Sequence, residues 1–319
     1  MTASLEAAVA EMAAETAWDP GSGAFSLRGA PPCRPGDPPE LGLRDQIYAR
    51  YFTRWSPPPE ALQRPFFGRV DGVPEFVAWL EAAAEGCDCW EPGYRVVKAQ
   101  DGWAYVAGVQ LTLFVDDLRS LHPPGAREGD EVSVRVPCAR PNLSPGFFYF
   151  VGRSGPVDSS QPHAKLYLNL APELTAPLLQ ALLRDREVER LVFEGKAVND
   201  PDAYCRADTA VLYVAPGDLS ELLRFLGDFH ARHAGGFRDG APLMTRELMR
   251  GVGLAESPTA PPGAPLSSFG QHRCGLLARA VAQCLQEARP ASAWMDVVRA
   301  VFDAEGLSAD RPWRGTLDL

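Results

Sequence analysis

Hydrophobic and polar residues alternate along residues 163–170, and this pattern predicts a strand. Three leucines fall on one face of the strand, and Lys165, Tyr167 and Asn169 fall on the other. A period of two is typical of a strand with one buried and one exposed face. The polar face carries an amine, a phenol and an amide, which can each handle a proton or bind an oxygen. We therefore expect the functional site to lie on this face.

In the first part of the chain, apolar residues recur every three to four positions, and this spacing predicts helices. Their ranges are 5–18, 41–55 and 73–84. Residues 19–40 are dense in proline and glycine and predict a loop. After about residue 95 the pattern changes to β-branched and aromatic residues, which favour strands. The sequence thus predicts a mainly helical region over residues 1–95 and a second region over residues 96–319.

The second region contains both the two-residue alternation of strands and the 3.6-residue spacing of helices. Strands are expected at residues 102–115 (bent at Gly108), 131–136, 147–151, 190–198 and 209–214. Helices are expected at residues 172–186, 218–233, 273–288 and 293–304, with Asp218 as an N-cap. Residues 237–271 are rich in proline and are expected to be mostly irregular. The predicted fold is α+β, a helical N-terminal part followed by a mixed or antiparallel sheet with flanking helices.

Composition narrows the function. The net charge of −10 argues against a general nucleic-acid binder, which needs a basic surface. No apolar run approaches the ~20 residues of a membrane helix, and the start of the chain does not resemble a signal peptide, so we expect a cytoplasmic protein that does not bind membranes. The seven cysteines are odd in number and scattered, and no suitably spaced ligands complete a zinc site around Cys87 and Cys89. We expect reduced thiols and no metal.

Three cations are candidate phosphate ligands: Lys196, Arg206 and Arg273. Arginine offers a planar fork of donors that matches phosphate oxygens, and lysine adds a compact charge. Lys196 and Arg206 belong to successive predicted strands, whereas Arg273 is at the start of a predicted helix, where free amides favour an anion. The alternative is that these cations form salt bridges with aspartates of the same loop, such as Asp208, which would then orient Arg206.

Lys165 and Tyr167 are a candidate pair for proton transfer. Lysine is a base only when neutral, so its pKa must fall from about 10.4 through burial or neighbouring cations. A tyrosine can donate a proton to a leaving oxygen. The alternative is a surface lysine beside a sheet tyrosine. His272, beside Arg273, is a further candidate, although a lone histidine is more often structural. Phosphate-binding glycine loops and nucleophile elbows are absent from the sequence.

These residues lie in stretches that resemble the HopA family of type III secretion effectors and its homologues in gene clusters for peptide natural products. The resemblance covers residues 145–288. Its stretches are 165–170, Lys196 to Pro201, Tyr204 to Tyr213, 242–245, 251–255 and Ser268 to Cys274. The homologues act in class V lanthipeptide and thioamitide clusters. The resemblance implies a lyase that removes phosphate from phosphoserine or phosphothreonine, after a separate kinase similar to aminoglycoside phosphotransferases has added it.

A more distant resemblance is to the phosphothreonine lyases of bacterial effectors, and it implies a fold of that kind. Those enzymes carry a lysine base and a histidine acid on one strand, and Lys165 is similar in place to the base. Lys196, Arg206 and Tyr213 follow in the order of their phosphate ligands. Tyr167 stands in the place of the histidine. The acid is therefore Tyr167 or His272, or the phosphate leaves unassisted.

Together these observations and resemblances give a hypothesis of phosphate β-elimination from a precursor peptide without metal or organic cofactor. Lys165 is the expected base and Tyr167 the expected acid. The remaining expected site residues, which bind phosphate or substrate, are Lys196, Arg206, Tyr213, Arg273, His272, Asn169, Asn199 and Asp208. The alternative hypothesis is a non-catalytic, effector-like module that binds a peptide or protein. Such a module does not need these side chains to converge.

Overall fold

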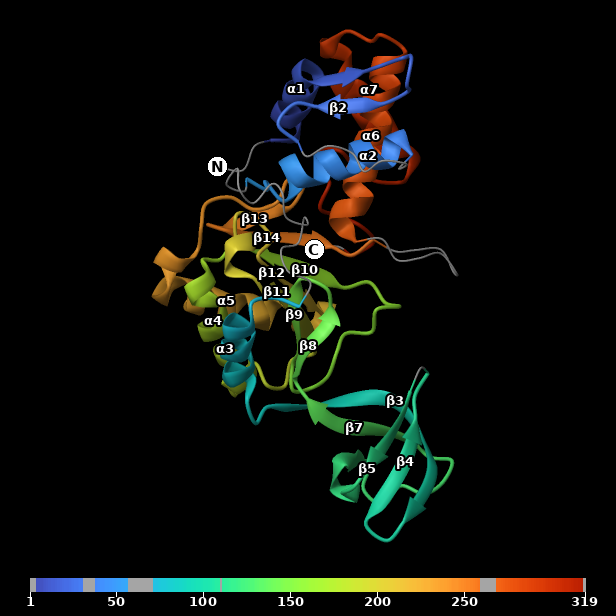
Figure 1. Cartoon of the computed structure of the whole chain (residues 1–319), viewed down its shortest axis with the longest axis vertical. Coiled ribbons are helices and arrows are strands. Elements are labelled where there is room, and N and C mark those ends of the chain that lie inside the picture. The colour runs from blue at the N-terminus through green and yellow to red at the C-terminus, as the bar shows by residue number, and fades with distance from the viewer. Residues whose placement is uncertain (1–3, 31–37, 57–70, 110, 259–267, 318–319) are drawn as a thin grey trace.

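A computed structural model describes residues 4–30, 38–56, 71–109, 111–258 and 268–317. Three parts follow one another along the long axis (Figure 1). Helices from both ends of the chain form one end, a seven-stranded sheet lies in the middle, and a five-stranded sheet forms the other end. The predicted α+β fold with an antiparallel sheet and flanking helices is confirmed.

The central sheet is antiparallel throughout, in the strand order β13-β14-β10-β12-β11-β9-β8. Its strands are β8 (Ala139–Ser144), β9 (Phe147–Val151), β10 (Ala164–Leu168), β11 (Phe193–Val198), β12 (Ala210–Val214), β13 (Arg246–Met249) and β14 (Val252–Glu256). The strand on which the sequence prediction centres, β10, lies in the interior of the sheet between β12 and β14.

Three helices cover one face of this sheet (Figure 1). They are α3 (Pro74–Ala84), α4 (Pro172–Arg184) and α5 (Leu219–Arg232). Leu166 and Leu168 of β10 point into the core beneath them, as the alternating pattern predicts. Asp218 stands at the N-cap position of α5 as expected, but its carboxylate makes no capping bond and instead accepts a hydrogen bond from the Val192 N–H at 2.8 Å.

The opposite face of β10 is also covered, which corrects the expectation of a half-exposed strand. All five residues of β10 are buried. Helices from the two chain ends pack over Tyr167 and Val211 and share one hydrophobic core with them. An alternating sequence shows which residues share a face, but it does not show whether a segment from elsewhere in the chain covers that face.

The covering helical part combines the two ends of the chain. It contains α1 (Leu5–Glu15), α2 (Pro39–Ile47), a π-helical turn (Tyr48–Phe52), α6 (Phe269–Gln286) and α7 (Trp294–Ala304), with a small hairpin of β1 (Thr16–Trp18) and β2 (Phe25–Leu27). Ser4 and Ser268 cap α1 and α6 by accepting hydrogen bonds from backbone N–H groups. Residues 31–37 of the expected loop lie outside the described residues.

The five-stranded sheet has the order β5-β4-β3-β7-β6. Its strands are β3 (Asp88–Gln100), β4 (Trp103–Ala107), β5 (Thr112–Val115), β6 (Leu121–His122) and β7 (Glu131–Pro137). The boundary expected near residue 95 therefore falls inside β3. The strand predicted at residues 102–115 is a hairpin, and the expected bend at Gly108 belongs to its turn, where the Gly108 N–H donates to the carbonyl of Leu111.

Residues 237–271 are mostly irregular where the structure describes them, as expected, but they also hold β13 and β14, which were not predicted, and β8 was not predicted either. These strands are short. The tight turn between β13 and β14 is made by Gly251 in the left-handed region, at φ +70°. Residues 259–267 of this stretch lie outside the described residues. Among the described helices, none combines the length and apolar composition that crossing a membrane requires.

Candidate functional site

The register of three strands brings the predicted residues onto one face of the central sheet. Lys165 of β10 pairs with Tyr213 of β12, and Tyr213 pairs with Glu194 of β11. In the next row Tyr167 pairs with Val211, which pairs with Lys196. Directly paired residues point to the same side of a sheet. The two lysines are therefore on one face, separated by a single strand.

Lys165 is enclosed, with 6% of its surface exposed. Burial, and then the neighbouring Lys196, lower the pKa of its amine to about 8 against the opposing effect of Glu194. Its Nζ lies 5.3 Å from the centre of the Tyr213 ring. Lys165 is thus a buried amine beside a second cation, which is the environment that a lysine base requires.

Lys196 and Arg206 meet over one aromatic ring. The Lys196 Nζ lies 4.3 Å, and the Arg206 guanidinium carbon 5.7 Å, from the centre of the Phe147 ring. Burial and then Arg206 lower the pKa of Lys196, while Asp208 raises it. We call Lys165, Lys196 and Arg206 the cation cluster. Its two lysines approach each other across β12, and Lys196 connects Lys165 with Arg206.

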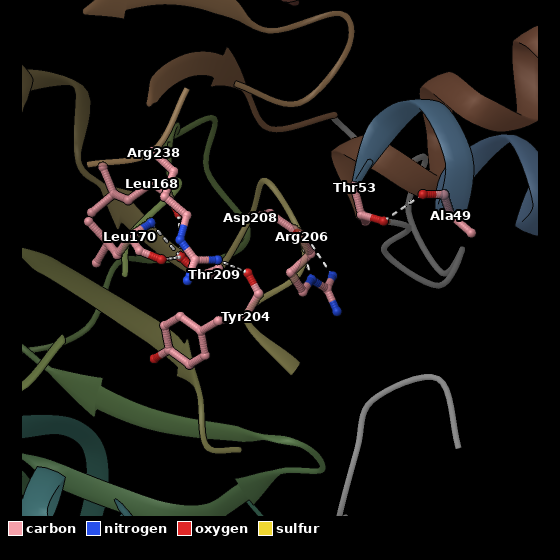
Figure 2. A network of polar contacts seen from close by, with 9 residues as sticks. All are labelled: Ala49, Thr53, Leu168, Leu170, Tyr204, Arg206, Asp208, Thr209 and Arg238. Atoms are coloured by element: carbon pink, nitrogen blue, oxygen red, sulfur yellow. Dashed lines mark hydrogen bonds and ion pairs between the residues drawn. The ribbon is translucent and has the colours of Figure 1, made fainter. Parts of the chain in front are cut away.

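Arg206 is held by Asp208 in a buried, two-pronged ion pair (Figure 2). Its Nε and one Nη donate to the two carboxylate oxygens at 2.5 and 2.8 Å. The sequence left open whether Arg206 binds phosphate or forms a salt bridge with an aspartate of its own loop. The salt bridge is present, and it also orients the guanidinium. The ion pair therefore fixes the direction of the guanidinium group.

The loop that carries Arg206 is tied down at both ends (Figure 2). At one end the Ala207 N–H donates to the carbonyl of Thr53 at 2.6 Å, which joins the loop to the helical part. At the other end the Thr209 hydroxyl donates to the Leu168 carbonyl at 3.0 Å and accepts from the Leu170 N–H at 2.7 Å. The site is therefore built on fixed backbone, with β10 and the Arg206 loop joined directly.

Tyr167 is closed in by aromatic rings. The rings of Phe52 and Phe269 lie 5.6 and 6.2 Å from the Tyr167 ring, centre to centre. Burial raises its pKa well above the ordinary value, so the phenol keeps its proton at neutral pH. Tyr167 adjoins Lys165 along the strand, but the helical part covers it.

Arg273 and His272 do not join the cation cluster. Arg273 donates to the carbonyls of Pro312 and Arg314, each at 2.8 Å, and a further Nη lies 2.9 Å from the Nδ1 of His272. Its guanidinium is thus occupied by the C-terminal segment. The side-chain amide of Asn169 donates to the carbonyls of Asp239 and Gly240, so it too is used structurally.

Asn199 lies at the end of β11 and is 1% exposed. Its carbonyl accepts a hydrogen bond from the Val73 N–H at the start of α3. This contact connects the strand to a helix on the far face of the sheet. The backbone of Asn199 therefore serves to join β11 to α3.

Sequence reasoning missed several residues on the same face. Phe147 and Tyr149 come from β9, Glu194 from β11, and Arg140 from β8. The register between β9 and β11 could not be read from one sequence. Glu194 did leave a signal, because it stands two residues before Lys196 in the strand and must share its face.

Lysine usage is a second signal that was missed. The 31 basic residues are 28 arginines and only three lysines, Lys98, Lys165 and Lys196. Two of the three lie in the cation cluster. Arginine cannot lose its proton in a protein, whereas lysine can. Among the described residues, no group of histidine, cysteine and carboxylate side chains is arranged to hold a metal ion.

The fold and this face define an α+β protein whose antiparallel sheet carries a buried cluster of cations. The sequence signature of the HopA1 effector protein family matches residues 138–314, more than half of the chain, and the chain belongs to this family. No curated protein sequence matches the chain.

Two solved structures are similar to it. One is an effector protein from Pseudomonas syringae pv. tomato strain DC3000, with 16% identity, a TM-score of 0.45, and coverage of 85% of this chain and 89% of that one. The other is an effector protein from Pseudomonas syringae pv. syringae strain 61, with 17% identity, a TM-score of 0.45, and coverage of 86% and 89%.

Proposed function

We propose that this protein is a phosphoserine or phosphothreonine lyase. It β-eliminates phosphate from a precursor peptide and leaves dehydroalanine or dehydrobutyrine, as a step in lanthipeptide or thioamitide biosynthesis. The observation that carries the proposal is Lys165, an enclosed amine with a pKa of about 8 beside Lys196, the second lysine of the cation cluster. At this pKa roughly a tenth of the amine is neutral at pH 7, far more than for an ordinary lysine.

In the proposed step, neutral Lys165 removes the proton from the α-carbon of the phosphorylated residue. The electron pair forms the double bond between the α- and β-carbons, and the bond from the β-carbon to the phosphate oxygen breaks. Lys196 and Arg206 bind the phosphate and stabilise the charge that it carries away. The step needs no cofactor, because phosphate leaves with the electron pair.

The carbanion that forms at the α-carbon carries charge onto the adjoining carbonyl oxygen, which needs a donor. Tyr213 is the better candidate, since it pairs with Lys165 across the two strands. The amide of Asn169 already donates to two backbone carbonyls. The phosphorylated precursor peptide is the proposed partner, and a separate kinase similar to aminoglycoside phosphotransferases is its proposed source.

The test is mass spectrometry of the kinase-phosphorylated precursor peptide incubated with the purified protein. The expected product has lost one phosphoric acid relative to the phosphopeptide. Lys165→Ala should abolish the loss while the peptide still binds. Lys98→Ala is the matched control, because Lys98 is the one lysine outside the cation cluster and is exposed on the five-stranded sheet. Its activity should be unchanged.

An unchanged mass, with the peptide bound, would favour the other hypothesis of an effector-like binding module. In that case Lys165→Ala and Lys196→Ala should differ from the wild type in affinity alone. Elimination that continues at the wild-type rate in Lys165→Ala would overturn the assignment of the base.

A further inference from the structure

Glu194 is a carboxyl group on the same face that the mechanism above does not use. It lies in line with Tyr213 and Lys165, one strand and two strands away respectively. It is half-buried, so it keeps some contact with solvent. Burial is unfavourable for a carboxylate unless hydrogen bonds or opposite charges compensate it, so a half-buried carboxyl beside the cation cluster is a candidate for a functional role.

The groups around Glu194 are placed to control its proton. Those that face it from the neighbouring strands are Tyr149 of β9, Arg140 of β8, Tyr213 of β12 and Lys165 of β10. The Tyr149 hydroxyl donates a hydrogen bond to the carboxylate. Burial raises the pKa of Glu194, and this outweighs the lowering by Tyr149, Arg140 and Lys165. The carboxyl therefore holds a proton at higher pH than an ordinary glutamate does.

The proposed elimination needs an acid. Phosphate that leaves as a trianion is a strong base, and protonation of the leaving oxygen as the bond breaks removes this barrier. Tyr167, the residue expected for this role, keeps its proton too firmly and is covered by Phe52 and Phe269. Glu194 is half-buried, burial raises its pKa, and it lies on the same face as the base.

We propose that Glu194 is the general acid of this site, an inference that rests on the proposed lyase function. Its carboxyl O–H donates a proton to the bridging oxygen while the carbon–oxygen bond breaks, and phosphate departs as the hydrogenphosphate dianion. The Lys165 ammonium, which holds the former α-proton, then returns a proton to the Glu194 carboxylate. The α-proton thus ends on phosphate, both side chains regain their starting states, and no outside proton is consumed.

The alternative is that Glu194 only balances the charge of Lys165. The two roles differ in their dependence on the leaving group. Sulfate is a far weaker base than phosphate and leaves without protonation, while an O-sulfoserine residue has nearly the shape of phosphoserine. A general acid is needed for the phosphate ester and not for the sulfate ester. A charge partner is needed for both.

The experiment compares Glu194→Gln with the wild type on two peptides of one sequence, carrying phosphoserine or O-sulfoserine. We expect Glu194→Gln to lose about 10²–10⁴-fold in phosphate elimination and to eliminate sulfate at the wild-type rate. Glutamine keeps the shape and can still accept the hydrogen bond of Tyr149. Glu221→Gln is the control, because Glu221 forms an exposed ion pair with Arg190, and both rates should be unchanged.

Equal losses on both peptides, or no loss on phosphoserine, would overturn the role of Glu194. If the wild type does not act on the O-sulfoserine peptide, the pH dependence of phosphate elimination tests the role of Glu194 instead. Wild-type kcat/KM should fall at high pH as Glu194 loses its proton, and Glu194→Gln should lose that falling limb. A variant that keeps the limb contradicts the proposal. If the wild type eliminates from neither peptide while binding the precursor, the lyase function itself has failed.

Discussion

Lys165 and Lys196 share one face of the central sheet with a single strand between them, and the charge of Lys196 lowers the pKa of Lys165. In the part of the chain that the structure describes, neither ammonium has a carboxylate within ion-pair distance. A buried amine such as Lys165, without an ion-pair partner, is unfavourable for folding on its own account. A phosphorylated ligand would bring the negative charge that this arrangement lacks.

Removing Lys196 should raise the pKa of Lys165. A neighbouring cation disfavours the ammonium form, so its removal favours that form, and the pKa should climb from about 8 toward the ordinary value of 10.5. The measurement is a pH titration of ¹³C-labelled lysine side chains by NMR in the wild type and in Lys196→Met. The chain has only three lysines, so the signals can be assigned by substitution. A Lys165 pKa that stays the same or falls would contradict the coupling.

Replacing Lys165 by methionine should stabilise the protein while abolishing elimination. The folded-state pKa of about 8 lies below the unfolded-state value near 10.5. The unfolded chain therefore binds more protons between these values, and the resulting penalty is complete below pH 8 and disappears above pH 10.5. At 1.36 kcal/mol per pKa unit, the gain at pH 7 is roughly 3 kcal/mol at most.

Urea denaturation of Lys165→Met and the wild type at pH 7 and at pH 10.5 tests this effect. The difference in unfolding free energy should shrink at the higher pH, where the wild-type penalty has gone. A difference that is independent of pH would mean that methionine stabilises through packing alone.

The ion pair between Arg206 and Asp208 should be costly to break from one side. Their side chains are 2% and 5% exposed, and removing one partner of a buried pair typically costs about 3–5 kcal/mol. We therefore expect Asp208→Leu to lose stability in this range by urea denaturation. The double variant Arg206→Met/Asp208→Leu should recover most of it, because no unpaired charge remains buried. A double variant that is as unstable as the single one would show that the pair itself supplies the stability.

Local pattern predicted much of this molecule. The strands β9 to β12 and the helix α4 were found because alternation and the leucine stripe are strong there. The strands β8 and β14 each contain a residue that disfavours strands, Pro141 and Gly253, and β13 has only four residues, so alternation is hardly visible in them. The packing of α2 on α6 joins segments more than 200 residues apart in the chain, and no local pattern records it.

The site residues likewise differ in how far local sequence predicted their positions. Lys165, Lys196 and Arg206 come together because they lie on strands that are consecutive in the order β10-β12-β11 or on the loop joining two of them. Arg273 looked equivalent in sequence, yet its place was decided by the C-terminal segment, 39 residues further along at Pro312. Residue type alone did not distinguish an arginine that donates to carbonyls, such as Arg273, from one that joins the cation cluster, such as Arg206.

Arg273 should therefore matter for stability and not for phosphate binding. Its charged hydrogen bonds to the carbonyls of Pro312 and Arg314 contribute about 1.5–3 kcal/mol each, so Arg273→Met should unfold at a lower urea concentration. Calorimetric titration with inorganic phosphate, under conditions where each variant is folded, should give wild-type affinity for Arg273→Met. Lys196→Met should bind phosphate more weakly, because it lacks one charge of the cation cluster. Equal weakening in the two variants would place Arg273 in the phosphate site after all.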